Sequence, residues 1–228
     1  MAAHLPASVG VIVTNLPRGG DGVPVPRRVS AAADIAVRGL RSLDLRAGER
    51  LVLVGNSYGA LLAYETAWRL CQAGVPVERL IVSGFRSPRL HPADAPLHRL
   101  PSDRLWAEVT ARYGVLPGAE ALHGDPEVEA CLRADLEACE TYRHDHDGRL
   151  AVPLDVLCLL DDPCVSEDEL AAWRSVTTGP VRLIPQAGGH FPWATAPEAM
   201  AATLVDLAEG PAGPPFSDLP TSPARDKL

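Results

Sequence analysis

Short apolar runs alternate with amphipathic stretches along most of the chain. The runs are rich in leucine or β-branched residues and lie at 9–14, 51–54, 80–83, 154–160 and 181–184. Apolar runs of this length, bounded by turn residues, predict buried strands. Apolar positions at helical spacing predict helices at about 31–40, 58–72, 167–175 and 197–208. Strands that alternate with helices predict an α/β fold, with a mainly parallel sheet and helices on both faces.

Local signals indicate where two of these helices end or begin. Gly74 and Pro76 follow the helix predicted at 58–72, and both residue types stop helices. Ser166 and Glu169 have the Ser-x-x-Glu spacing of a capping box, in which each side chain bonds the backbone of the other residue. We therefore expect the helix at 167–175 to start directly after Ser166.

A long segment interrupted by prolines separates the third run from the fourth. It covers about residues 85–148, which is too long for a simple crossover, and predicts an inserted helical cap. Apolar residues at helical spacing after Ser102 predict one cap helix, and Asp125 followed by Pro126 predicts the start of another. The apolar faces of two such helices either pack against each other or surround an acyl chain. We expect plain packing for most of these positions.

Length and composition favour one folded domain at 1–210, followed by a disordered tail at 211–228. The chain has 228 residues, of which 46% are hydrophobic and 22% charged, as is usual for a globular protein in water. No apolar run approaches the roughly 18 residues that a membrane helix needs. The first residues lack the features of a secretion signal. We expect a cytoplasmic monomer that does not contact membranes.

Charge and cysteine usage exclude further classes of function. The net charge is −8, and lysine and arginine are scattered, which argues against a nucleic-acid surface. No CxxC pair occurs, so we interpret the cysteines as buried thiols. The histidine pairs His91/His98 and His144/His146 lack zinc-site spacing, and we interpret them as parts of exposed polar loops. We expect no metal and no cofactor. The five cysteines are Cys71, Cys131, Cys139, Cys158 and Cys164.

The clearest chemical motif is Gly-Asn-Ser-Tyr-Gly at residues 55–59. It directly follows the apolar run 51–54 and leads into the helix at 58–72. Such a serine sits on a sharp strand-to-helix turn and is exposed above the sheet, which the flanking glycines permit. A bare match is common in structural turns, but this context favours Ser57 as a nucleophile. We expect the backbone N–H of Tyr58 to bind the oxyanion.

An acid and a histidine follow two later runs, in the order expected for this type of site. Asp161 and Asp162 follow 154–160, and His190 follows 181–184 after two glycines. Loops at the carboxyl ends of parallel strands converge, so these residues can meet Ser57. The aspartates could otherwise be a solvated turn, and the histidine a structural one. We predict His190 as the base and Asp162, in preference to Asp161, as the acid that orients it.

These motifs together resemble the type II (editing) thioesterases of polyketide and nonribosomal peptide assembly lines. The resemblance runs from about residue 9 to residue 208. It implies hydrolysis of acyl or aminoacyl thioesters on the phosphopantetheine arm of an acyl or peptidyl carrier protein, which clears stalled or wrongly primed chains. It also implies that the domain at 1–210 is an α/β-hydrolase and that the inserted cap gates its site. The motifs that carry it are the elbow with its continuation to Glu65, Val82-Ser83-Gly84, Leu97 to Pro101, Glu140 to Arg143, Ala171 to Trp173, Thr177 to Gly179 and Gly188 to Phe191.

The chain departs from this family pattern at two places. Asn56 stands where members usually have histidine. Members also begin with a further strand and a Pro-His-Ala-Gly-Gly type of loop, which supplies a second oxyanion donor and precedes the run at 9–14. We expect that strand and donor to be missing here, which leaves unpaired backbone in the core or forces 9–14 to pair with 51–54. Loss of one donor weakens turnover by about 100-fold to 1,000-fold.

Three hypotheses explain the expected lack of this strand and loop: a start codon placed too late, a natural truncation, or a repurposed protein. The intact triad pattern favours the first. Two other functions remain open beside hydrolysis. The same acyl-serine serves an acyltransferase or cyclase, in which a nucleophile other than water resolves it. A catalytically impaired subunit that binds a carrier protein would keep the fold without the activity.

Overall fold

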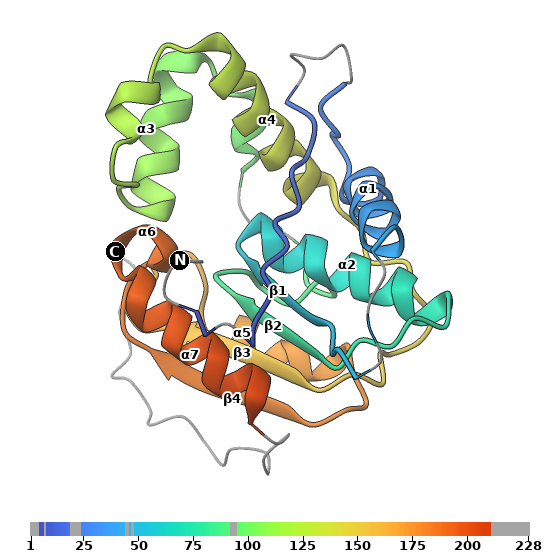
Figure 1. Cartoon of the computed structure of the whole chain (residues 1–228). Helices are drawn as coiled ribbons and strands as arrows, with labels where there is room; N and C mark the ends of the chain where they lie inside the picture. The colour runs from blue at the N-terminus through green and yellow to red at the C-terminus, as the bar shows by residue number, and fades with distance from the viewer. Residues whose placement is uncertain are drawn as a thin grey trace.

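The chain folds around a four-stranded parallel sheet (Figure 1). The computed structural model describes residues 5–6, 8–18, 24–43, 46, 48–91 and 95–210. Within these residues the strand order is β1-β2-β3-β4, so neighbours in sequence are neighbours in the sheet. The strands match four of the five predicted runs. They are β1 (Val52–Asn56), β2 (Arg79–Ser83), β3 (Leu154–Leu159) and β4 (Val181–Gln186).

Helices cover both faces of this sheet, as the alternating pattern predicted. Strand residues point alternately to the two faces, and Leu80 and Val82 belong to the larger core while Ile81 belongs to the smaller one. The larger core lies under α1 (Val29–Arg41), α2 (Tyr58–Gln72) and α5 (Glu167–Ala171). The smaller core lies under α7 (Pro197–Glu209), which follows the short α6 (Pro192–Thr195). The α/β class is therefore confirmed.

The helix predicted at 167–175 is α-helical only in its first part. Ser166 forms the predicted capping box, since its hydroxyl accepts from the Glu169 N–H and the Glu169 carboxylate accepts from the Ser166 N–H. After Ala171 the chain tightens into a 3₁₀ turn, η4 (Ala172–Ser175). This turn buries Trp173 completely, and its indole N–H donates to the Phe85 carbonyl at 2.8 Å.

The apolar run at 9–14 is not a strand, which contradicts the prediction. Residues 9–18 form no ladder with the sheet, and β1 pairs only with β2 among the described residues. Val11, Ile12 and Val13 are 39%, 55% and 70% exposed. A strand exists only where a neighbour supplies ladder partners for its N–H and C=O groups, and nothing in the described sheet does so for this run. Of the two expected consequences of a missing strand, direct pairing between 9–14 and 51–54 does not occur.

The cap contains the two helices that its sequence predicted. They are α3 (Ser102–Tyr113) and α4 (Pro126–Thr141), accompanied by the 3₁₀ turns η2 (Leu97–Arg99) and η3 (Ala119–Leu122). Asp125 caps α4 by accepting the N–H groups of Glu127 and Val128. Leu97, Leu105 and Leu136 form a small core of their own between these elements. Their apolar faces thus pack against each other, as expected for most positions.

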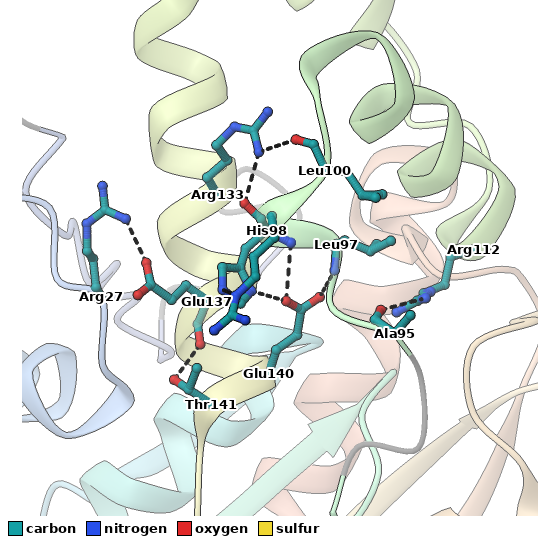
Figure 2. A network of polar contacts seen from close by, with 11 residues as sticks. Arg27, Ala95, Leu97, His98, Leu100, Arg112, Arg133, Glu137, Glu140 and Thr141 are labelled. Atoms are coloured by element: carbon teal, nitrogen blue, oxygen red, sulfur yellow. Dashed lines mark hydrogen bonds and ion pairs between the residues drawn. The ribbon is translucent and has the colours of Figure 1, made fainter.

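Polar contacts fasten η2 to α4 inside the cap (Figure 2). The Arg133 guanidinium donates to the carbonyls of His98 and Leu100 at 2.9 and 2.7 Å. The Glu140 carboxylate accepts the backbone N–H groups of Leu97 and His98 at 2.7 and 3.2 Å, and also contacts the His98 ring. Two segments that the family resemblance singled out, 97–101 and 140–143, therefore brace each other across the cap.

The tail predicted to be disordered, residues 211–228, lies outside the described residues. Among the helices that the structure describes, none combines the length and the apolar composition required to traverse a bilayer.

Candidate active site

Ser57 occupies a strained turn between β1 and α2. Its φ of 53° and ψ of −125° make it the one non-glycine residue with positive φ in the described part of the chain. Its backbone N–H donates to the Ser83 carbonyl at 2.9 Å. A Cβ at Gly55 would lie 2.0 Å from the Gly59 carbonyl oxygen, so only glycine fits there. Strain of this kind costs about 1–3 kcal/mol and concentrates at functional sites.

His190 links the Ser57 hydroxyl to the Asp162 carboxylate. Its Nε2 lies 2.9 Å from Ser57 Oγ, and its Nδ1 lies 2.9 Å from Asp162 Oδ2. The histidine is only 3% exposed, so water competes little for these bonds. Asp161 is exposed, and its backbone N–H donates to the Gly188 carbonyl. The structure thus brings Ser57, His190 and Asp162 together, and the contact to His190 comes from Asp162.

The surroundings of Asp162 favour its ionised form. Burial by itself opposes the charge, but the hydrogen bond and charge of His190 and the N–H of Cys164, at 2.9 Å from Oδ1, outweigh burial. The pKa of the Asp162 carboxyl therefore lies below its ordinary value. A carboxylate at this position holds the proton of a neutral imidazole on Nδ1 and leaves Nε2 available to accept a proton from Ser57.

Tyr58 is the first residue of α2, so its N–H lies in the first helical turn. N–H groups in that turn have no acceptor within the helix, and the helix dipole favours negative charge beside them. A developing oxyanion next to Ser57 would meet these groups. The Tyr58 side chain points into the protein, where burial raises the pKa of its phenol.

Three further residues support the site, and sequence reasoning gave them no such role. Asn56 donates to the His190 carbonyl at 3.1 Å and accepts from the Ser83 hydroxyl at 2.6 Å. Gly84 has φ of 60°, and a Cβ there would lie 3.3 Å from the His190 ring and 3.4 Å from the Asp162 carboxylate. The Tyr113 ring, at the end of α3, lies 4.8 Å from that of His190.

The sequence carried a signal for only two of these three. Asn56 lies inside the elbow motif, and Gly84 directly follows the neighbouring strand β2. Their positions in the sequence could therefore have placed both near the site. Tyr113 comes from the cap, and its contact depends on how the cap rests on the sheet. Burial raises the pKa of Tyr113 to about 12, so its phenol stays neutral beside His190.

Three of the four paired histidines do not lie in exposed polar loops, which corrects that prediction. His91 is exposed, but His98 contacts Glu140, and His144 and His146 are half-buried against α2. His144 Nε2 lies 2.9 Å from the Tyr64 hydroxyl, and the His146 ring stacks on Trp68. Their polar partners come from α2, far from them in sequence, and these contacts bury the loop.

The buried carboxylate of Glu65 holds residues 142–146, the histidine segment that carries His144 and His146. The side chain of Glu65 is 3% exposed and accepts hydrogen bonds from the Tyr142 hydroxyl at 2.7 Å and from the His146 ring at 2.8 Å. It also pairs with Arg69. The contacts connect α2, which carries Ser57 at its start, to the segment that leaves the cap.

All five cysteines lie in the described part of the chain, and none of them forms a disulfide. Cys131 and Cys158 are buried, as predicted, whereas Cys71, Cys139 and Cys164 are half-buried.

Comparison with known protein sequences identifies a family and relatives that include named thioesterases. A sequence model of the thioesterase domain family matches residues 1–207. A Streptomyces griseus protein named as a probable cadicidin biosynthesis thioesterase is 40% identical over 163 residues, which are 70% of this chain and 43% of that protein. Thioesterase PikA5 of Streptomyces venezuelae is 40% identical over 147 residues, which are 62% of this chain and 51% of PikA5. The chain thus spans about half the length of these relatives.

Solved structures agree with the sequence comparison. The RedJ thioesterase from the prodiginine biosynthetic pathway in Streptomyces coelicolor superposes with a TM-score of 0.78 and 30% identity, over 88% of this chain and 80% of RedJ. The type II thioesterase BorB from the borrelidin biosynthetic cluster gives a TM-score of 0.65 and 29% identity, over 79% of this chain and 70% of BorB. With a family match over nearly its whole length, the chain belongs to the thioesterase domain family.

Proposed function

We propose that the chain is a serine thioesterase that hydrolyses acyl or aminoacyl thioesters on the phosphopantetheine arms of carrier proteins. The observation that supports this most directly is the hydrogen-bond chain from Ser57 through His190 to Asp162. It lies at a strained elbow in a member of the thioesterase family. The relatives named for cadicidin, borrelidin and prodiginine biosynthesis support an acyl group on a carrier protein as the substrate.

In the first half of the reaction, Ser57 becomes acylated. Its Oγ attacks the thioester carbonyl while His190 Nε2 takes the hydroxyl proton, and Asp162 stabilises the imidazolium that results. The carbonyl oxygen gains the negative charge and accepts hydrogen bonds from N–H groups such as that of Tyr58. The C–S bond then breaks, and His190 gives its proton to the sulfur, which leaves as the free thiol of the arm.

The second half of the reaction uses the same groups with water as the nucleophile. His190 takes one proton from water, and the oxygen attacks the acyl-serine carbonyl. When the bond to Ser57 Oγ breaks, His190 returns the proton to that oxygen. The products are the free acid and the regenerated enzyme, so one water is consumed for each thioester.

The test combines a variant with a covalent probe. Ser57→Ala should abolish release of a short acyl group from a loaded carrier protein and should remove labelling by a fluorophosphonate, because both require the Ser57 oxygen. Ser175→Ala, at an exposed serine remote from the site, is the matched control and should keep both. The mass of the product distinguishes hydrolysis, which adds water, from cyclisation, which does not.

Two outcomes would contradict the proposal. One is full acyl release by Ser57→Ala. The other is a wild-type protein that binds the carrier protein but neither takes up the probe nor releases the acyl group, which is the behaviour of a non-catalytic subunit.

A further inference from the structure

Cys164 lies beside the proposed triad in space. Its Sγ, a carboxylate oxygen of Asp162 and a ring nitrogen of His190 all lie within 4.8 Å of one another. Asp162 and Cys164 share the turn that follows β3, where the Cys164 N–H donates to the Asp162 carboxylate. Among the described residues, this is the one group of three side chains with potential metal ligands at such short separations.

We infer that Asp162, Cys164 and His190 form an inhibitory binding site for a thiophilic divalent cation of the zinc type. Thiolate, imidazole and carboxylate are the three ligand types that Zn²⁺ uses in proteins. At tetrahedral geometry and ordinary bond lengths, the ligand atoms stand about 3.3–3.6 Å apart. The three groups reach this spacing by shifts of about 1 Å, and a water completes the fourth position.

Binding at this site would disable His190 as a base. The cation takes the place of the proton between His190 Nδ1 and Asp162, so the imidazole, still neutral, carries its proton on Nε2. That nitrogen then donates to Ser57 Oγ and has no lone pair with which to accept the hydroxyl proton. The Cys164 thiol releases its own proton to solvent as it becomes a thiolate ligand. This effect on turnover rests on the proposed function, whereas cation binding does not.

The residues around this group determine how the cation reaches it and which hydrogen bonds its binding breaks. Pro163 is exposed and Cys164 is half-buried, whereas the side chains of Asp162 and His190 are only 3% and 2% exposed. The cation therefore reaches the group from the Cys164 side of the turn after β3. On the cap side the Tyr113 ring covers His190. Binding breaks the 2.9 Å bond from the Cys164 thiol to the Arg112 carbonyl at the end of α3, and it also breaks the bond between Asp162 and His190.

The first experiment measures binding without any activity. The full chain is titrated with Co²⁺, a spectroscopic substitute for Zn²⁺, and the near-ultraviolet charge-transfer band of a cobalt–thiolate bond is recorded. Cys164→Ser keeps the size of the side chain but removes the soft ligand. Cys71→Ser is the matched control, since that half-buried thiol lies at the other end of α2, about 20 Å from the elbow. We expect the band in wild type and Cys71→Ser, and none in Cys164→Ser.

The second experiment measures inhibition of thioester hydrolysis by Zn²⁺, with each variant compared with its own metal-free rate. Zn²⁺ should inhibit wild type and Cys71→Ser alike, and Cys164→Ser should need about tenfold more cation or beyond. A cobalt–thiolate band that persists in Cys164→Ser, no band in wild type, or equal inhibition of all three proteins would overturn the inference. A cobalt band in a wild type that hydrolyses no thioester would support the cation site and refute the proposed function.

Discussion

Asn56 ties the loop of His190 to the ends of two strands. Its amide donates to the His190 carbonyl at 3.1 Å and accepts from the Ser83 hydroxyl at 2.6 Å. Asn56 ends β1 and Ser83 ends β2, so one side chain connects both strands to the loop that carries the proposed base. Asn56→Ala removes both bonds. It leaves the Ser83 hydroxyl, on a residue that is only 2% exposed, without this acceptor.

The structure gives separate magnitudes for stability and for turnover. Two neutral hydrogen bonds, with one buried partner left behind, correspond to a fall of about 1–3 kcal/mol in the free energy of unfolding. The effect on turnover comes from the position of His190, since a shift of about 1 Å in a catalytic group can cost about 100-fold. We expect kcat to fall by about 10-fold to 100-fold and KM to change little, because Asn56 acts through His190.

Steady-state hydrolysis of an acyl-pantetheine thioester, followed through the released thiol, gives kcat and KM, and urea unfolding gives the stability. Ser83→Ala is the matched control, because it removes the 2.6 Å bond and keeps the bond to the His190 carbonyl. That variant should lose comparable stability but stay within about threefold of wild-type kcat. The reasoning is refuted if Asn56→Ala keeps kcat within about twofold, or if Ser83→Ala loses as much kcat.

Three other predictions concern the acid, the buried carboxylate and a histidine. Asp162→Asn should lower kcat by about 10⁴-fold, because His190 then adopts the wrong tautomer, whereas Asp161→Asn should stay near wild type; equal losses would contradict the assignment. Glu65→Ala should cost about 3 kcal/mol or more in urea unfolding, against about 0.5 kcal/mol or less for the half-exposed Glu78→Ala. Burial, with nearby positive charge, holds the pKa of His144 below its ordinary 6.5. As the pH falls, the imidazole is therefore protonated in the unfolded chain before it is protonated in the folded protein. Stability should therefore fall as the pH drops below about 6.5, and His144→Gln should reduce that slope.

The parts of the fold that the sequence predicted correctly depend on local signals. The helix at 58–72 has the bounds of α2 because the elbow precedes it and Gly74 follows it. The capping box at Ser166 forms because its two partners are three residues apart. The strand predicted at 9–14 is absent because a strand needs a neighbouring strand to pair with, and the residue pattern within the run says nothing about that neighbour.

In the proposed site, too, local signals predicted some residues, whereas others depend on contacts between distant parts of the chain. The proximity of Ser57, Asp162 and His190 could be predicted because each follows a strand, and the carboxyl ends of parallel strands meet at one edge of the sheet. The contacts of Tyr113 and Cys164 with this site were not found. Tyr113 reaches His190 only through the placement of the cap, and Cys164 joined the group only once the turn after β3 was known.

The histidine segment shows where a signal existed and was not used. Glu65 stands within the apolar stretch 60–70, on a helix whose neighbouring positions are buried. A carboxylate in such a place is costly unless donors surround it. Arg69, four residues on in the same helix, pairs with one oxygen of Glu65, and the other oxygen needs donors from elsewhere in the chain. The hydroxyl of Tyr142 and the ring of His146 supply them. An acidic residue on the apolar face of a helix is thus evidence that some remote polar residues are buried, even where their own surroundings look like an exposed loop.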